Sequence, residues 1–178
     1  MSDSTPPRDG DRRSAARPTV DRSTLLAAAA LGVGLGGLLD VILFHLVLQT
    51  HHLVSGIVPP TSLQGLRTNV LADGLFSLVM LLVMGVAAVR LWSTLVEADP
   101  ARPLSASAVG GAAVVGLGAW NVFDVVVDHA LLGLHHATYP VLDVYDLGWF
   151  VASLVLVGAG WLAVRGATPS SSTGQSAD

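Results

Sequence analysis

The stretch GVGLGGLLDVILFHLVLQTHH, residues 32–52, recurs without a gap as GLGAWNVFDVVVDHALLGLHH, residues 116–136. The chain has six histidines, and all of them fall in these two stretches. Ionisable side chains are costly inside a membrane, so a duplicated set in such apolar sequence indicates a specific role. The offset of 84 positions pairs Asp40 with Asp124, His45 with His129, His51 with His135 and His52 with His136.

The composition predicts an integral membrane protein. Of the 178 residues, 52% are hydrophobic and only 12% are charged, which is too apolar for a soluble domain of this size. Backbone groups find no hydrogen-bond partners in lipid, so the apolar segments are expected to be helices. Four segments are long enough to cross a hydrocarbon core of about 30 Å: residues 24–49, 70–92, 106–132 and 144–164.

The duplication predicts how these helices are organised. Each repeat would be a helix pair, at about 24–96 and about 104–166, because Asp73 opens the second segment as Asp146 opens the fourth. We expect an all-α fold: a bundle of four transmembrane helices made of two tandem parallel helix-pair repeats. Residues 1–23 are expected to be a disordered cytoplasmic tail and residues 167–178 a disordered C-terminal tail.

Arginine sets the expected orientation, since the chain has no lysine. Five arginines precede the first segment, Arg90 and Arg102 flank the link between the second and third, and Arg165 follows the fourth, whereas only Arg67 lies in a loop on the other side. The positive-inside rule then places both termini in the cytoplasm and the histidine-bearing ends on the extracytoplasmic side. The absence of cysteine excludes disulfides and thiolate ligands. No basic cluster with interleaved aromatic residues is present, so nucleic acid is not an expected partner.

Helix geometry limits how the polar residues can combine. At about 100° per residue, Asp40 would lie about 140° away from His45, and His45 would lie on the same face as His52 but about 10 Å away. One ion therefore cannot bind both of these histidines on a straight helix. We expect Asp40, Asp124 and Asn121 to orient the imidazoles or to relay protons. The candidate metal ligands, drawn from different helices, are His45, His51, His52, His129, His135, His136, Asp73, Asp128 and Asp146. The last three, the aspartates, would be either ligands or residues that orient the imidazoles.

Imidazole and carboxylate ligands suit copper(II), zinc, iron or manganese, and we favour copper or zinc over iron. The same residues have two other interpretations. They could form a hydrogen-bond network that holds the helices in register, or a proton relay. A continuous proton route is disfavoured because residues 25–31 and 79–89, in the cytoplasmic half, contain no ionisable side chain.

Several motifs resemble those of a bacterial family of predicted membrane proteins catalogued as domain of unknown function 2243. The resemblance covers about residues 32–165, and it implies a location in the bacterial cytoplasmic membrane but no activity. It rests on Gly36-Gly37-x-x-Asp40, Phe44-His45, Leu48-Gln49-x-His51-His52, Asp73-Gly74-Leu75-Phe76, and Asp128-His129-x-Leu131-Leu132-Gly133-x-His135-His136.

The chain departs from the family pattern at Ser77 and Ala130, where members often have histidine, and at Val41, where they often have glycine. The resemblance therefore implies a reduced set of ligands here, which disfavours a full catalytic di-metal centre more than simple metal binding. The family also suggests a link to copper assembly of respiratory oxidases, with a membrane protein as partner.

We therefore expect a membrane protein that binds copper or zinc for handling or delivery, as a monomer or a homo-oligomer, rather than an enzyme. The alternative is a membrane metal-dependent oxidoreductase, because membrane desaturases carry clustered His-x-x-His-His boxes. The spacing here is His-x-x-x-x-x-His-His, and the histidines are expected on the opposite side of the membrane.

Overall fold

The computed structural model describes residues 21–98, 104–138 and 142–167. The expected tails lie outside the described residues except for residues 21–23 and 167, which belong to the ends of the first and last helices. The elements in chain order are α1 (Arg22–Asp40), the π-helix η1 (Val41–Val47), α2 (Leu63–Glu97), α3 (Ala106–Phe123), the π-helix η2 (Asp124–Leu131) and α4 (Val144–Ala167).

Three of the helices begin at a polar cap that the sequence supplies. The side chains of Asp21, Ser62 and Ser105 each accept a hydrogen bond from the backbone N–H three residues further on. These bonds satisfy donors that a helix N-terminus otherwise leaves free.

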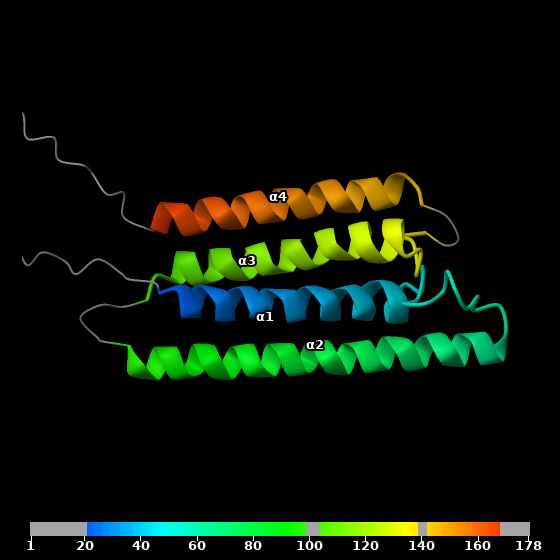
Figure 1. Ribbon diagram of the computed structural model, residues 1–178, viewed down its shortest axis with the longest axis horizontal. Helices are drawn as coiled ribbons and strands as arrows, with labels where there is room; N and C mark the ends of the chain where they lie inside the picture. Colours follow the sequence, from blue (N-terminus) through cyan, green and yellow to red (C-terminus); the bar gives the residue numbers. More distant parts are fainter. Residues whose placement is uncertain (1–20, 99–103, 139–141, 168–178) are drawn as a thin grey trace, which may run out of the picture.

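The helices run alternately up and down, with α1 and α3 side by side at the centre (Figure 1). Helix α2 packs against α1, and α4 packs against α3. Because α1 and α3 point in the same direction, the π-helices that extend them both lie at one end of the bundle.

Glycines allow the two central helices to approach closely. A Cβ atom at Gly32 would overlap the carbonyl of Ala113, and one at Gly116 would overlap the carbonyl of Ala29. The two contacts are equivalent under the offset of 84 positions, because Gly32 corresponds to Gly116 and Ala29 corresponds to Ala113. Close backbone packing of this kind is how membrane helices associate when lipid removes the hydrophobic driving force.

All four helices are long and apolar enough to cross a membrane, with a mean hydropathy between 1.5 and 2.3 in their most apolar windows. Large apolar side chains such as Leu82, Val89 and Leu162 lie on the outer surface, where lipid would cover them. Helix α2 has 35 residues and is therefore about 52 Å long, so it extends beyond a hydrocarbon core of about 30 Å. The protein is thus a multi-pass membrane protein.

The interior of the bundle differs between its two ends. The buried apolar side chains toward the start of α1 and α3 are small, and include Ala28, Ala108 and Ala112. At the other end most of the fully buried side chains are polar, and these include His45, His135 and Asp73. Burial of so many ionisable groups identifies this end as the candidate functional site.

Candidate metal centre

The change from α-helix to π-helix decides which polar groups face one another. A π-helix is hydrogen-bonded between residues i and i+5, so side chains five apart lie above one another. Asp40 and His45 are five apart, and Asp40 Oδ2 lies 3.7 Å from His45 Nε2. In the second copy, Asp124 Oδ2 lies 3.1 Å from His129 Nε2. The expected separation of about 140° between Asp40 and His45 is therefore wrong, because it assumed α-helical geometry throughout.

Each π-helix ends in a turn that folds the chain back over the site. Leu48 N donates to Leu43 O, and Thr50 N donates to Phe44 O. The residue between them, Gln49, has φ 52°, and the matching residue, Gly133, has φ 59°. This left-handed residue reverses the chain, so the histidines that follow it lie beside His45 and His129 rather than further along a straight helix.

A buried carboxylate from the next helix holds each of the π-helix histidines. His45 Nδ1 donates to Asp73 Oδ1 at 2.8 Å, and Leu53 N donates to the same oxygen at 2.9 Å. His129 Nδ1 donates to Asp146 Oδ1, and Ala137 N donates to that oxygen at 2.9 Å. These bonds fix the ring orientation and leave each Nε2 as the nitrogen with a free lone pair.

The two returning loops cross and hold each other's histidine. His51 Nδ1 donates to the carbonyl of Ala137 at 3.2 Å, and His135 Nδ1 donates to the carbonyl of Leu53 at 3.1 Å. The two rings stack with centroids 4.9 Å apart and planes at 12°. The carbonyl oxygens of these loops are a part of the site that the sequence pattern did not reveal, because any residue supplies a carbonyl.

With all four Nδ1 atoms engaged, four imidazole Nε2 atoms converge in the interior. The Nε2 atoms of His45, His51, His129 and His135 are buried and make no hydrogen bond with the described residues. The ring centroids of His45 and His51 are 4.6 Å apart, and those of His129 and His135 are 4.4 Å apart. Asp124 faces two of these rings, with its Oδ1 3.3 Å from His135 Nε2.

Two overlapping groups of side chains have ligand atoms within 4.8 Å of one another: His45, His51 and His135 form one, and Asp124, His129 and His135 form the other. His51 lies beyond the end of the first membrane-spanning segment, and its pKa is lowered. Burial, and then the neighbouring imidazoles of His45, His135 and His129, lower the pKa of His51 to about 3. Its ring is therefore neutral near pH 7 and able to donate a lone pair.

The remaining candidates lie around this cluster. His52 Nδ1 donates to Asp73 Oδ2 at 2.8 Å, and the ring of His136 lies 6.2 Å from that of His129. Burial lowers the pKa of His136 as well. Asp128 is buried on η2, and Asn121 is buried on α3 one turn before the π-helix begins.

The two pairs of aspartates lie on the opposite sides of the imidazole rings from those expected. Asp40 and Asp124, expected to orient the imidazoles, lie on the Nε2 side of the rings. Asp73 and Asp146, expected as ligands or orienting groups, lie on the Nδ1 side. Of the two roles proposed for Asp73 and Asp146, their position favours orientation of the rings.

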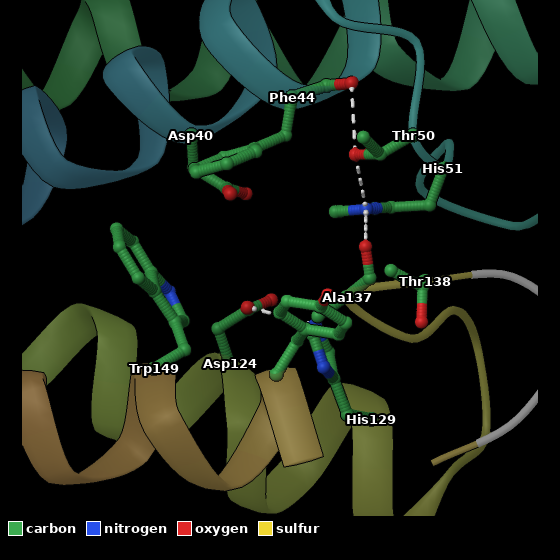
Figure 2. A pocket seen from close by; sticks show the side chains of 10 residues that line it. Asp40, Phe44, Thr50, His51, Asp124, His129, Ala137, Thr138 and Trp149 are labelled. Atoms are coloured by element: carbon green, nitrogen blue, oxygen red, sulfur yellow. Dashed lines mark hydrogen bonds and ion pairs between the residues drawn. The ribbon is translucent and has the colours of Figure 1, made fainter. Parts of the chain in front are cut away.

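A pocket of about 260 Å³ adjoins the cluster (Figure 2). Asp40, His51, Asp124 and His129 line it together with aromatic side chains from η1 and α4. The sequence motifs included Phe44 but gave no sign of Tyr145, Thr138 or Trp149 as site residues. These three are brought to the site by the loop before α4 and by its first turns.

The comparisons with known proteins give a family but no activity. The model of a family described as "Predicted membrane protein (DUF2243)" matches residues 27–167. No curated protein and no solved structure matches the chain.

Proposed function

The chain belongs to the family of predicted membrane proteins of unknown function DUF2243, and from the geometry of its polar end we propose that it binds a transition metal ion. The ligands would be the Nε2 atoms of His45, His51, His129 and His135, with Asp40 and Asp124 completing the set. The proposed site is the meeting point of two matching half-sites, one from each expected repeat.

The observation that carries the proposal is the state of the four imidazoles. Each ring donates its Nδ1 hydrogen to a carboxylate or a carbonyl, and each Nε2 is buried without a hydrogen bond. An unsatisfied buried polar atom costs about 1–3 kcal/mol, so four of them converging on one place need a common reason. Metal-binding histidines have this arrangement, in which the second nitrogen is held by an outer hydrogen bond.

The spacing of the facing atoms suits a metal ion. Ligand atoms about 2.0–2.1 Å from an ion lie about 2.9 Å apart at a right angle and about 3.4 Å apart at a tetrahedral angle. The oxygens of Asp124 lie 3.1 Å from His129 Nε2 and 3.3 Å from His135 Nε2, within that interval. The 3.7 Å between Asp40 and His45 would shorten slightly on binding.

Charge balance supports the same conclusion. Five aspartates are buried in the described part of the chain, and the buried charged or ionisable residues there include no arginine. Buried carboxylates need a cation, because uncompensated charge in an apolar interior is strongly destabilising. With His51 neutral near pH 7, a metal ion could supply positive charge that this imidazole does not.

The donor set favours copper(II) or zinc, with iron less favoured. The arginine distribution supports a site at the extracytoplasmic side of the bacterial membrane. There the protein would capture an ion and hold it or pass it on, with an oxidase assembly protein as the proposed recipient. We favour this binding role over a hydrogen-bond network alone, because a network would join each Nε2 to an acceptor by a well-formed hydrogen bond. Here none of the four Nε2 atoms makes such a bond with the described residues, although three of them face an oxygen of Asp40 or Asp124 at 3.1–3.7 Å.

Metal analysis of the detergent-purified full chain tests the proposal. We expect about one or two copper or zinc ions per chain after loading, and a clear loss in the double variant His45→Ala, His129→Ala. The variant His136→Ala is the matched control, since it removes a histidine from the edge of the cluster and should keep the metal. Equal trace metal in the wild type and the double variant, both with the wild-type helical circular dichroism, would contradict metal binding.

A further inference from the structure

The His/Asp cluster adjoins a pocket that lies between η1 and α4. Asp40, His51, Asp124 and His129 form the buried floor of the 260 Å³ pocket (Figure 2). The Nε2 atom of His51 makes no hydrogen bond with the described residues, and that of His129 faces Asp124 Oδ2 at 3.1 Å; these two histidines are only 5% and 2% exposed. The inner end of the pocket is therefore formed by histidines whose Nε2 atoms we propose as metal ligands.

The walls of the pocket are aromatic. Phe44 from η1 and Trp149 from α4 meet edge to face, with ring centroids 5.2 Å apart. Tyr145, at the start of α4, and Thr50, just after η1, also line the pocket and are exposed. The entrance thus lies at the histidine-bearing end of the bundle, where α4 begins.

The opposite side of the cluster is packed by aromatic side chains. There Trp120 packs against Phe76, with ring centroids 5.3 Å apart, and His45 and His135 are completely buried. The position 84 residues before Trp120 is Gly36, so the side that faces Trp149 has no equivalent of this indole. The pocket of about 260 Å³ lies on the side of Trp149, where the Trp120 indole has no equivalent.

We infer that this pocket binds a small neutral molecule with one aromatic ring and an oxygen substituent, of the phenol class, with the oxygen pointing toward the His/Asp floor. The inference rests on the proposed function for one contact, that between the oxygen of the bound molecule and the metal ion, in which the oxygen would complete the coordination of the ion. Metal sites that act on a ligand keep such an open position, whereas structural sites are closed.

The size and chemistry of the pocket select this class. An apolar cavity of about 150 Å³ accommodates benzene, so 260 Å³ has room for a substituted ring. Aromatic walls favour edge-to-face contact with another ring. A lipid acyl chain would leave the carboxylates and imidazoles of the floor without partners, and an anion would be repelled by Asp40 and Asp124.

Equilibrium dialysis of radiolabelled phenol against the full-length protein in detergent tests the inference, with binding to empty micelles subtracted. The variant Thr138→Phe places a ring in the pocket without altering a proposed ligand. Val54→Phe is the matched control, since it introduces the same side chain at the position 84 residues earlier, which does not line the pocket. Thr50→Phe, at the exposed entrance, is a second blocking variant. Because the Thr50 hydroxyl lies 3.1 Å from His51 Nδ1, zinc uptake by this variant is measured as well, to show that His51 is still in place.

We expect both blocking variants to bind phenol at least tenfold more weakly than the wild type, and Val54→Phe to bind it normally. Toluene should bind at least tenfold more weakly than phenol, because it lacks the oxygen. Equal phenol binding by the blocking variants and the control overturns the inference, and so does toluene binding as tight as phenol binding.

The two proposals can fail separately. Zinc binding without any effect of the blocking variants on phenol would remove the pocket inference alone. Phenol binding that the blocking variants abolish, in a protein that takes up no zinc, would remove the metal proposal, since the phenol hydroxyl could then donate directly to a carboxylate of the floor.

Discussion

Replacing Asp73 by asparagine tests whether the outer carboxylates hold the imidazoles in place. Asp73 is fully buried and accepts from His45 Nδ1 and His52 Nδ1 at 2.8 Å each, and from Leu53 N at 2.9 Å. Asparagine has the same shape but only one acceptor oxygen, and its NH₂ group cannot accept from an imidazole N–H. At least one imidazole would therefore lose its partner.

The expected loss can be estimated from the chemistry of such groups. Changing an outer-shell partner of a metal-binding histidine typically lowers metal affinity 10- to 100-fold, which corresponds to about 1.4 to 2.8 kcal/mol. Because His45 remains in place, the variant should still bind metal, but more weakly. The loss should thus be smaller than in the variant that removes His45 itself.

Competition between the protein and a chromogenic zinc chelator measures this affinity. The matched control is Asp143→Asn, at the same end of the protein, because Asp143 accepts from Thr138 Oγ1 and Tyr145 N but from no imidazole. We expect wild-type affinity in the control and a 10- to 100-fold loss in Asp73→Asn. Wild-type affinity in a correctly folded Asp73→Asn protein would refute the assignment of Asp73 as an orienting group.

Three further predictions follow from the packing and from the proposed ligands. Gly32→Ala should lower the thermal stability of the purified protein, because its Cβ would overlap backbone atoms of the neighbouring helix. The control Gly110→Ala, which has open space around it, should be neutral or should stabilise the protein by up to about 1 kcal/mol. Equal melting temperatures of the two variants would contradict close packing at Gly32. Gly133→Ala should destabilise the protein by roughly 1–2 kcal/mol in chemical denaturation, because the left-handed conformation at φ 59° disfavours a Cβ, and an unchanged unfolding midpoint would contradict the turn. Zinc at a free concentration 100 times its dissociation constant should raise the free energy of unfolding by about 2.7 kcal/mol. This gain should vanish in the double variant His45→Ala, His129→Ala. An equal gain in that variant would show that the zinc binds at another site.

Much of the fold could be predicted from the sequence, because lipid restricts the chain to helices and the apolar segments mark them. The four expected spans correspond to the four helices long and apolar enough to cross a membrane. The sequence also marks the candidate site residues, since six histidines in one duplicated pattern stand out against apolar sequence, but their role as metal ligands stays a prediction. The tandem-repeat organisation stays a prediction, which the reciprocal contacts of Gly32 and Gly116 support.

The arrangement within the site could not be predicted, for two physical reasons. A spacing of five residues places Asp40 and His45 on different faces of an α-helix but on one face of a π-helix, and nothing in the apolar residues between them distinguishes the two. The crossing of the loops depends on backbone carbonyls of Leu53 and Ala137, which leave no signature in the sequence. The pocket likewise depends on Trp149 and Tyr145, which a helix far along the chain brings to the site.

X-ray absorption at the metal edge of the copper- or zinc-loaded protein tests the central claim most directly. We predict several imidazole nitrogens at about 2.0–2.1 Å from the ion, with a lower imidazole number in the variant His135→Ala, since His135 belongs to both groups of converging side chains. A shell of oxygen atoms alone, or an imidazole number that His135→Ala leaves unchanged, would contradict a metal ion bound by the buried histidines.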